Sequence, residues 1–160
     1  MYSNLKISEA KKLLKDELDQ QILELDAADQ VKTEYPISVE EYKLNHPRGA
    51  LLVVYKGSDY KGSNNDASKL ESFILQDRDI HIGVICIIRK NASGGMDVDD
   101  YVDFVKESLT GLVTAADRAD NKTYPIADEW MKEDGGEWWY GITILVPGLN
   151  VEQEILDNQS

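Results

Sequence analysis

The sequence has few of the residues that build metal sites and nucleophilic sites, with one cysteine and two histidines in 160 residues. The single cysteine, Cys86, excludes an internal disulfide, and one thiolate cannot form a zinc site. Because disulfides persist mainly in oxidising compartments, this scarcity favours a reducing, cytosolic environment. The separation of His81 and Cys86 is odd, so on a shared strand they would project to opposite faces and could not form a nucleophilic pair.

Long apolar runs are also missing. None approaches the length that spans a bilayer, and Met1–Lys6 does not begin a basic region followed by an apolar stretch. We therefore expect neither a membrane segment nor a signal peptide. Hydrophobic residues still make up 42% of the chain, which is enough for a packed core. We predict one domain over residues 1–148, followed by a polar tail over residues 149–160.

Positive charge is scarce, because 17 basic residues face 30 acidic ones and the net charge is −13. Such a surface repels phosphate backbones, so we do not expect sequence-specific binding of nucleic acid. It would suit a basic protein partner, or a surface past which DNA slides without sticking. Solubility alone would also explain the charge.

Two segments have the three- and four-residue apolar spacing of amphipathic helices. The first follows Ser8, which we predict as its N-cap. Its apolar positions are Ile7, Ala10, Leu14, Leu18, Ile22 and Leu25. The second follows Asp97 and Asp99, either of which can cap the free N–H groups of a helix. Its apolar positions are Val98, Val102, Val105, Leu109 and Leu112.

Four segments are predicted as strands. Residues 50–55 form a short apolar run, and residues 76–89 form a longer one that alternates at its start. Residues 126–131 and 137–147 flank Asp134-Gly135-Gly136, whose glycines allow the positive φ angles of a tight hairpin turn. We predict that residues 33–49 are an irregular connection packed on the domain by Tyr35, Ile37 and Tyr42. Residues 59–68 are predicted as an exposed polar loop.

The fold class that follows is α+β in two layers. It consists of a four-stranded, mostly antiparallel sheet with helices on one face, in the order α-β-β-α-β-β.

Acidic clusters invite a catalytic or metal-binding interpretation, which the spacing does not favour. Asp97, Asp99 and Asp100 lack the glycine and closing glutamate of a calcium loop, and capping of a helix explains them better. Glu129 and Glu133 flank an exposed turn, where nothing predicts the raised pKa of a catalytic acid. We therefore predict no catalytic residue, no cofactor, no metal site and no enzyme activity.

The three tryptophans all lie in the predicted hairpin. Trp138 and Trp139 are adjacent on a strand, so one faces the core and the other faces a covering helix, solvent or a partner. An exposed aromatic side chain on a sheet is a common sign of an interface. The candidate interface residues are Tyr60, Asn64, Asn65, Trp130 and Trp139.

Four segments together resemble the Mu-like prophage tail protein family, over about residues 49–147. They are residues 50–60 with Gly57-Ser58-Asp59-Tyr60, the strand from Gln76 to Asn91, the helix from Tyr101 to Leu112, and the acidic and aromatic run from Glu133 to Tyr140. The resemblance implies a tail terminator without catalytic residues.

Such a protein forms a ring with copies of itself, typically six, at the head-proximal end of the tail tube. There it would contact tube or sheath proteins and head-completion proteins, first in the cytoplasm of the bacterial host and then in the virion. Two alternatives stay open. One is an acidic immunity or inhibitor protein that binds a basic enzyme. The other is an enzyme whose site is built from scattered residues.

Overall fold

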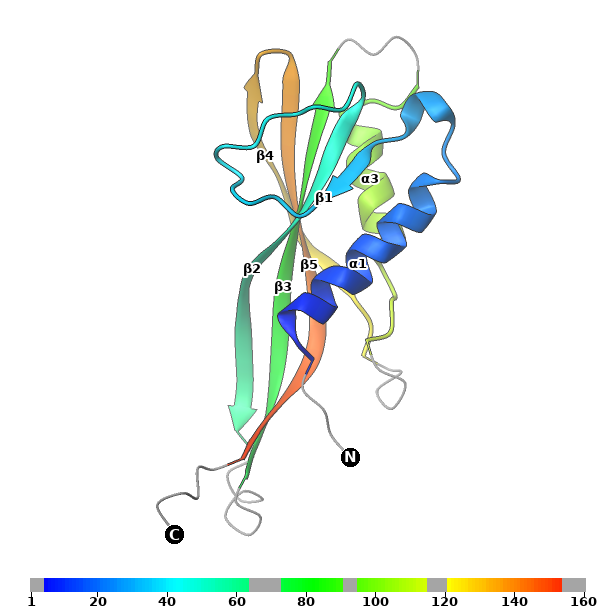
Figure 1. The fold of residues 1–160 in the computed structure, drawn as a ribbon. Helices are drawn as coiled ribbons and strands as arrows, with labels where there is room; N and C mark the ends of the chain where they lie inside the picture. The colour runs from blue at the N-terminus through cyan, green and yellow to red at the C-terminus, as the bar shows by residue number, and fades with distance from the viewer. Residues whose placement is uncertain (1–4, 64–72, 91–94, 115–120, 154–160) are drawn as a thin grey trace.

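The protein folds around one long sheet that carries helices on one face and an irregular segment on the other (Figure 1). The computed structural model describes residues 5–63, 73–90, 95–114 and 121–153. The five strands lie in the order β1-β2-β3-β5-β4. Their bounds are β1 Lys32–Glu34, β2 Gly49–Ser63, β3 Phe73–Arg89, β4 Tyr124–Asp134 and β5 Glu137–Gln153. β1 pairs parallel to β2, and the other neighbours pair antiparallel.

The prediction of an α+β fold is confirmed, but the predicted sheet of four strands was incomplete. The fifth strand, β1, lies inside the segment predicted as an irregular connection, and its three residues are too few to show an alternating pattern. The element order therefore has an additional strand after the first helix. The predicted antiparallel majority is confirmed, since β1 with β2 is the one parallel pair in this sheet.

The α-helices are α1, Ile7–Ile22, and α3, Val98–Ser108, and a short 3-10 turn, η1, spans Ala27–Asp29. α1 begins before Ser8, so the predicted N-cap is wrong; Lys6 is the N-cap, and its backbone N–H donates to the Glu9 carboxylate. The predicted cap of α3 is confirmed, because Asp97 accepts from the Asp100 backbone N–H at 3.0 Å. No helix in the described ranges combines the length and the apolar character needed to cross a bilayer.

The central strands are longer than the sequence predicts. β2 continues past residue 55 through a bulge at Lys56, so residues 59–63 of the predicted loop are strand. The rest of that loop, from Asn64, lies outside the described residues. β5 runs to Gln153, past the predicted end of the domain at residue 148. An antiparallel ladder continues as long as its neighbour supplies hydrogen bonds, and side-chain patterns do not mark where it stops. We call residues 59–63, 73–79 and 147–153 the arm, which extends beyond α1 (Figure 1).

The helix face of the sheet holds the main core. Apolar side chains of α1 and α3 pack on alternate residues of β2, β3 and β5, which confirms that both helices lie on one face. From α1 these side chains are Ala10, Leu14, Leu18 and Ile22, and from α3 they are Tyr101, Val102 and Val105. The apolar side chains that recur every 3.6 residues on the helices therefore pack against those that recur every two residues on the strands, in one continuous cluster.

The opposite face, which we call the back face, has a smaller apolar cluster. Ala50, Leu52, Ile85, Ile87 and Trp139 form it, and the segment between β1 and β2 covers it with Val39, Tyr42 and Leu44. The prediction that this segment packs on the domain is therefore correct for Tyr42. It is wrong for Tyr35 and Ile37, which are exposed because they lie beside β1, before the chain turns onto the back face.

The hairpin turn has the predicted form. Asp134 and Glu137 are paired, and the two residues between them, Gly135 and Gly136, have φ angles of 56° and 84°. Positive φ at both positions is typical of a type I′ turn, which matches the right-handed twist of the strands.

Candidate functional site

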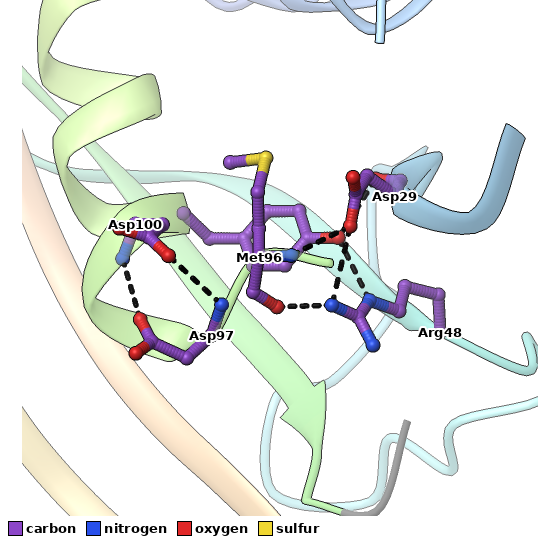
Figure 2. A network of polar contacts seen from close by, with 6 residues as sticks. Asp29, Arg48, Met96, Asp97 and Asp100 are labelled. Atoms are coloured by element: carbon purple, nitrogen blue, oxygen red, sulfur yellow. Dashed lines mark hydrogen bonds and ion pairs between the residues drawn. The ribbon is translucent and has the colours of Figure 1, made fainter. Parts of the chain in front are cut away.

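The most elaborate polar arrangement in the described structure surrounds Arg48, immediately before β2 (Figure 2). Its guanidinium lies among three partners from distant parts of the chain. Arg48 Nε donates to Tyr101 Oη of α3 at 2.9 Å, and Arg48 Nη2 lies 3.3 Å from Asp29 Oδ1 of η1. Nη2 also donates to the carbonyl oxygen of Met96. The side chains of Arg48, Asp29 and Tyr101 are buried, so this is an ion pair with its hydrogen bonds inside the protein.

Two further hydrogen bonds join residues of this network. Tyr101 Oη donates to the Asp29 carbonyl oxygen at 2.8 Å, and the Met96 backbone N–H donates to Asp29 Oδ1 at 2.7 Å. Gly95 precedes Met96 with φ of 83°, and a Cβ there would collide with Asp29 Oδ1. The pKa of Tyr101 is raised, chiefly by burial. These contacts hold η1, the start of β2 and the start of α3 together, so the network stabilises the fold.

A pocket of about 490 Å³ adjoins the network between α3 and the hairpin. Its lining includes Lys90, Trp138 and Tyr140, together with Met96 and Val98 at the start of α3. Lys90 Nζ lies 4.8 Å from the centroid of the Trp138 ring and 2.7 Å from Glu133 Oε1. The lysine is therefore engaged with the hairpin rather than directed at the centre of the pocket.

The predicted separation of His81 and Cys86 is confirmed. Cys86 belongs to the core on the helix face, and burial raises the pKa of its thiol to about 12. His81 pairs with Gly57 and lies on the back face, where His81 Nε2 is 3.3 Å from Asp59 Oδ2. A thiol with so high a pKa is a poor nucleophile. Within the described ranges, no three His, Cys, Asp or Glu side chains gather in a way that could hold a metal ion.

Several acidic side chains of the hairpin are engaged in separate ion pairs. Asp128 accepts from Lys106 of α3 at 3.0 Å, and Asp134 Oδ2 lies 3.9 Å from Lys132 Nζ. With the Glu133–Lys90 pair, these contacts distribute the carboxylates along β4 instead of bringing two together. The arrangement is typical of a charged strand surface.

The predicted interface residues fall in different environments. Trp130 is 54% exposed on β4, and Tyr60 is 50% exposed on the arm beside Arg78. Trp139 is only 4% exposed because the segment between β1 and β2 covers it, so its expected exposure is corrected. Asn64 and Asn65 lie outside the described residues.

Exposed apolar side chains also occur at positions that the sequence pattern did not identify as exposed. Several of them lie close to the two edge strands of the sheet. After β1 they are Tyr35 and Ile37, and on β4 they are Tyr124, Ile126 and Met131, while Leu23, Tyr55 and Val113 are exposed elsewhere. Ile126 and Met131 coincide with the two bulges of β4, which break the alternation that would have indicated their direction.

The model of the Gp37 protein family matches residues 23–160, so the chain belongs to this family of phage-associated proteins. No curated protein matches the chain. The family match begins just after α1 and includes β1, the whole sheet and α3.

Proposed function

We propose that this member of the Gp37 family is a structural protein of a phage or prophage tail, and specifically a tail terminator. It would form a ring of identical copies at the head-proximal end of the tail tube and stop further addition of tube subunits. The family match supports the assignment to a phage, and the resemblance of residues 49–147 to Mu-like prophage tail proteins supports the role in the tail.

The observation that carries the proposal is the contrast between the covered faces and the open edges of the sheet. Over the half of the sheet that carries helices, α1 and α3 cover one face and residues 35–48 cover much of the other. The large exposed apolar side chain Ile37 follows β1 and Trp130 lies on β4, and β1 and β4 are the two edge strands. A ring needs a contact between two different surfaces of each subunit, and two unlike edges supply them.

The charge of the chain supports the same role. A tail tube conducts DNA, and a wall with a net charge of −13 per subunit would repel the phosphate backbone. We propose a structural rather than an enzymatic function, with tube, sheath and head-completion proteins as partners. Assembly would take place in the bacterial cytoplasm, and the final location would be the virion tail.

Electron microscopy of tails made without this protein tests the proposal. If the protein terminates the tube, tails produced after deletion of its coding sequence have no defined length, and the protein supplied in trans restores a single length. Tails of normal length in its absence would refute the role. Isolation of the protein in a tight, salt-sensitive complex with a basic enzyme, combined with normal tails, would favour the inhibitor alternative.

A further inference from the structure

We infer that neighbouring copies of this chain join edge to edge, with Tyr35 and Ile37 of one copy packed against Trp130 and Met131 of the next. The inference rests on the proposed ring-forming function and names the two surfaces that would close the ring. We call Tyr35–Ile37 the β1-side surface and Trp130–Met131, with the outer edge of β4, the β4-side surface.

The β1-side surface combines apolar side chains with charged groups of α1, in which Asp16 and Asp19 accompany the lysines around Tyr35. Ile37 is fully exposed, with a relative exposure of 107%, and Tyr35 is 45% exposed. Lys11 Nζ and Lys15 Nζ of α1 lie 4.9 Å and 5.6 Å from the centroid of the Tyr35 ring. Lys15 also pairs with Asp19, whereas Lys11 has no ion pair within the described residues. An aromatic ring framed by ammonium groups suits an acidic, aromatic partner.

The β4-side surface has more acidic than basic groups. Asp128, Glu133 and Asp134 are paired with lysines of the same chain, and Glu129 has no ion pair among the described residues. Trp130 is the most exposed of the large hydrophobic side chains on β4. The strand carries Asp128, Glu129, Glu133 and Asp134 but only one basic residue, Lys132. In the described structure β4 pairs with β5 alone, so its outer edge presents free backbone groups. An exposed edge with aromatic side chains is a ready template for another chain.

The charges and lengths of the two edges favour an unlike contact over a like one. Two β4 edges placed together would oppose two acidic strands, and like charges opposite one another destabilise a pair of strands. Two β1 edges would offer only three strand residues each. The contact between β1 and β4 brings apolar groups together and places Lys11, which has no ion pair among the described residues, on the side that faces Glu129.

The positions of the two edges are compatible with this contact. β1 pairs with residues 50–52 of β2, and β4 pairs with residues 137–145 of β5, so both edges lie in the half of the sheet that carries the helices. The arm extends away from β1 and β4 (Figure 1). Copies joined in this way would therefore place their covered halves side by side and direct every arm to the same end of the ring.

Disulfide crosslinking between two single-cysteine variants tests the contact. Ile37→Cys and Trp130→Cys are each prepared in the full chain, mixed and oxidised. The native Cys86 is buried in the core with a pKa of about 12, so it does not compete. Both substituted positions are exposed, so circular dichroism and the thermal midpoint should stay unchanged. The expected product is a mixed disulfide that forms only when both variants are present.

A matched control uses Tyr60→Cys, which is similarly exposed but lies on the arm. It should give no crosslink with Trp130→Cys. The double variant Ile37→Cys/Trp130→Cys should give a ladder of covalent oligomers, because each copy then carries both halves of the contact. Three outcomes would overturn the inference: crosslinks of Trp130→Cys with itself, crosslinks with Tyr60→Cys of equal yield, or no crosslinks at all.

The deletion experiment separates a failure of this inference from a failure of the function. Tails of undefined length after deletion, together with absent mixed disulfides, would leave the terminator role standing and refute these two surfaces. Mixed disulfides together with tails of normal length would leave the contact standing and refute the role.

Discussion

The two faces of the sheet are covered by different kinds of structure. On the helix face, α1 and α3 bury a large continuous cluster that includes Leu14, Leu18 and Val105. On the back face, the irregular segment between β1 and β2 buries a small cluster around Trp139. Beyond that cover the back face becomes polar, with Lys56 Nζ donating to Thr143 Oγ1 at 2.9 Å. Both faces are thus covered within the chain over this half of the sheet, and exposed apolar side chains also lie beside β1 and on β4.

Arg48 joins the end of the segment that covers the back face to Tyr101 of α3 on the helix face. Its loss should therefore have the largest effect on stability. Replacing Arg48 with Met leaves the Asp29 carboxylate buried without its cation, which we expect to lower the free energy of unfolding by about 3–5 kcal/mol. Urea unfolding followed by circular dichroism measures the change. Lys12→Met, at an exposed ion pair of α1, is the control and should leave the stability nearly unchanged. Equal stabilities of the two variants would show that the network holds nothing together.

A pair of leucine truncations sharpens the difference between the faces. Leu18→Ala removes a fully buried side chain on the helix face and should cost about 2–5 kcal/mol. Leu44→Ala removes a partly buried side chain from the back-face cover and should cost about 1 kcal/mol. Denaturant titrations of both variants under one set of conditions provide the comparison. A larger loss for Leu44→Ala would mean that the irregular segment, and not the helices, dominates the stability.

Alanine substitutions at two glycines with nearly the same backbone conformation separate the cost of backbone strain from the cost of a side-chain collision. Gly95 has φ of 83° and faces Asp29, whereas Gly111 has φ of 85° with no atom within 4 Å of an added Cβ. Gly111→Ala should cost about 1–2 kcal/mol from the left-handed conformation alone. Gly95→Ala adds displacement of the Asp29 carboxylate and should cost about 1–3 kcal/mol more. Thermal unfolding of both variants measures the difference, and equal losses would contradict the geometry around Asp29.

The smallest expected effect is a pH dependence in the back-face cover. The Tyr42 hydroxyl donates to the Glu34 carboxylate, and this hydrogen bond is the main reason why the pKa of Glu34 lies below its ordinary value of 4.5. The resulting stability is therefore present above pH 4.5 and is lost as the pH falls through the lowered pKa. Tyr42→Phe should cost about 1 kcal/mol at neutral pH and progressively less in acid. The free energy of unfolding measured against pH tests this, with the exposed Tyr35→Phe as control. A loss that does not depend on pH would contradict the assignment.

The helix face was predictable from the sequence because regular periods determine it. The stripe of α1 from Ala10 to Ile22, the Asp97 cap and the Gly135-Gly136 turn all follow from local spacing. The back-face cover and β1 were not predictable in the same way. A three-residue strand has no period, and a bulge such as that at Met131 disrupts the alternation of a longer one.

The Arg48 network escaped prediction for a related reason. Arg48 and Tyr101 are 53 residues apart, and Arg48 and Asp29 are 19 residues apart, so no local pattern connects them. Trp130 was predicted as an interface residue because an exposed tryptophan on a strand is typical of interfaces. Ile37 was assigned to the interior, since an isolated isoleucine in an irregular segment is usually buried.

The most direct test of the central proposal is a cryo-electron microscopy map of the head-proximal end of purified tails. We predict a ring in which each copy of this fold places its residues 35–37 against β4 of the next copy. Density at that end that this chain does not fit, or a ring whose copies meet through the arm, would contradict the account.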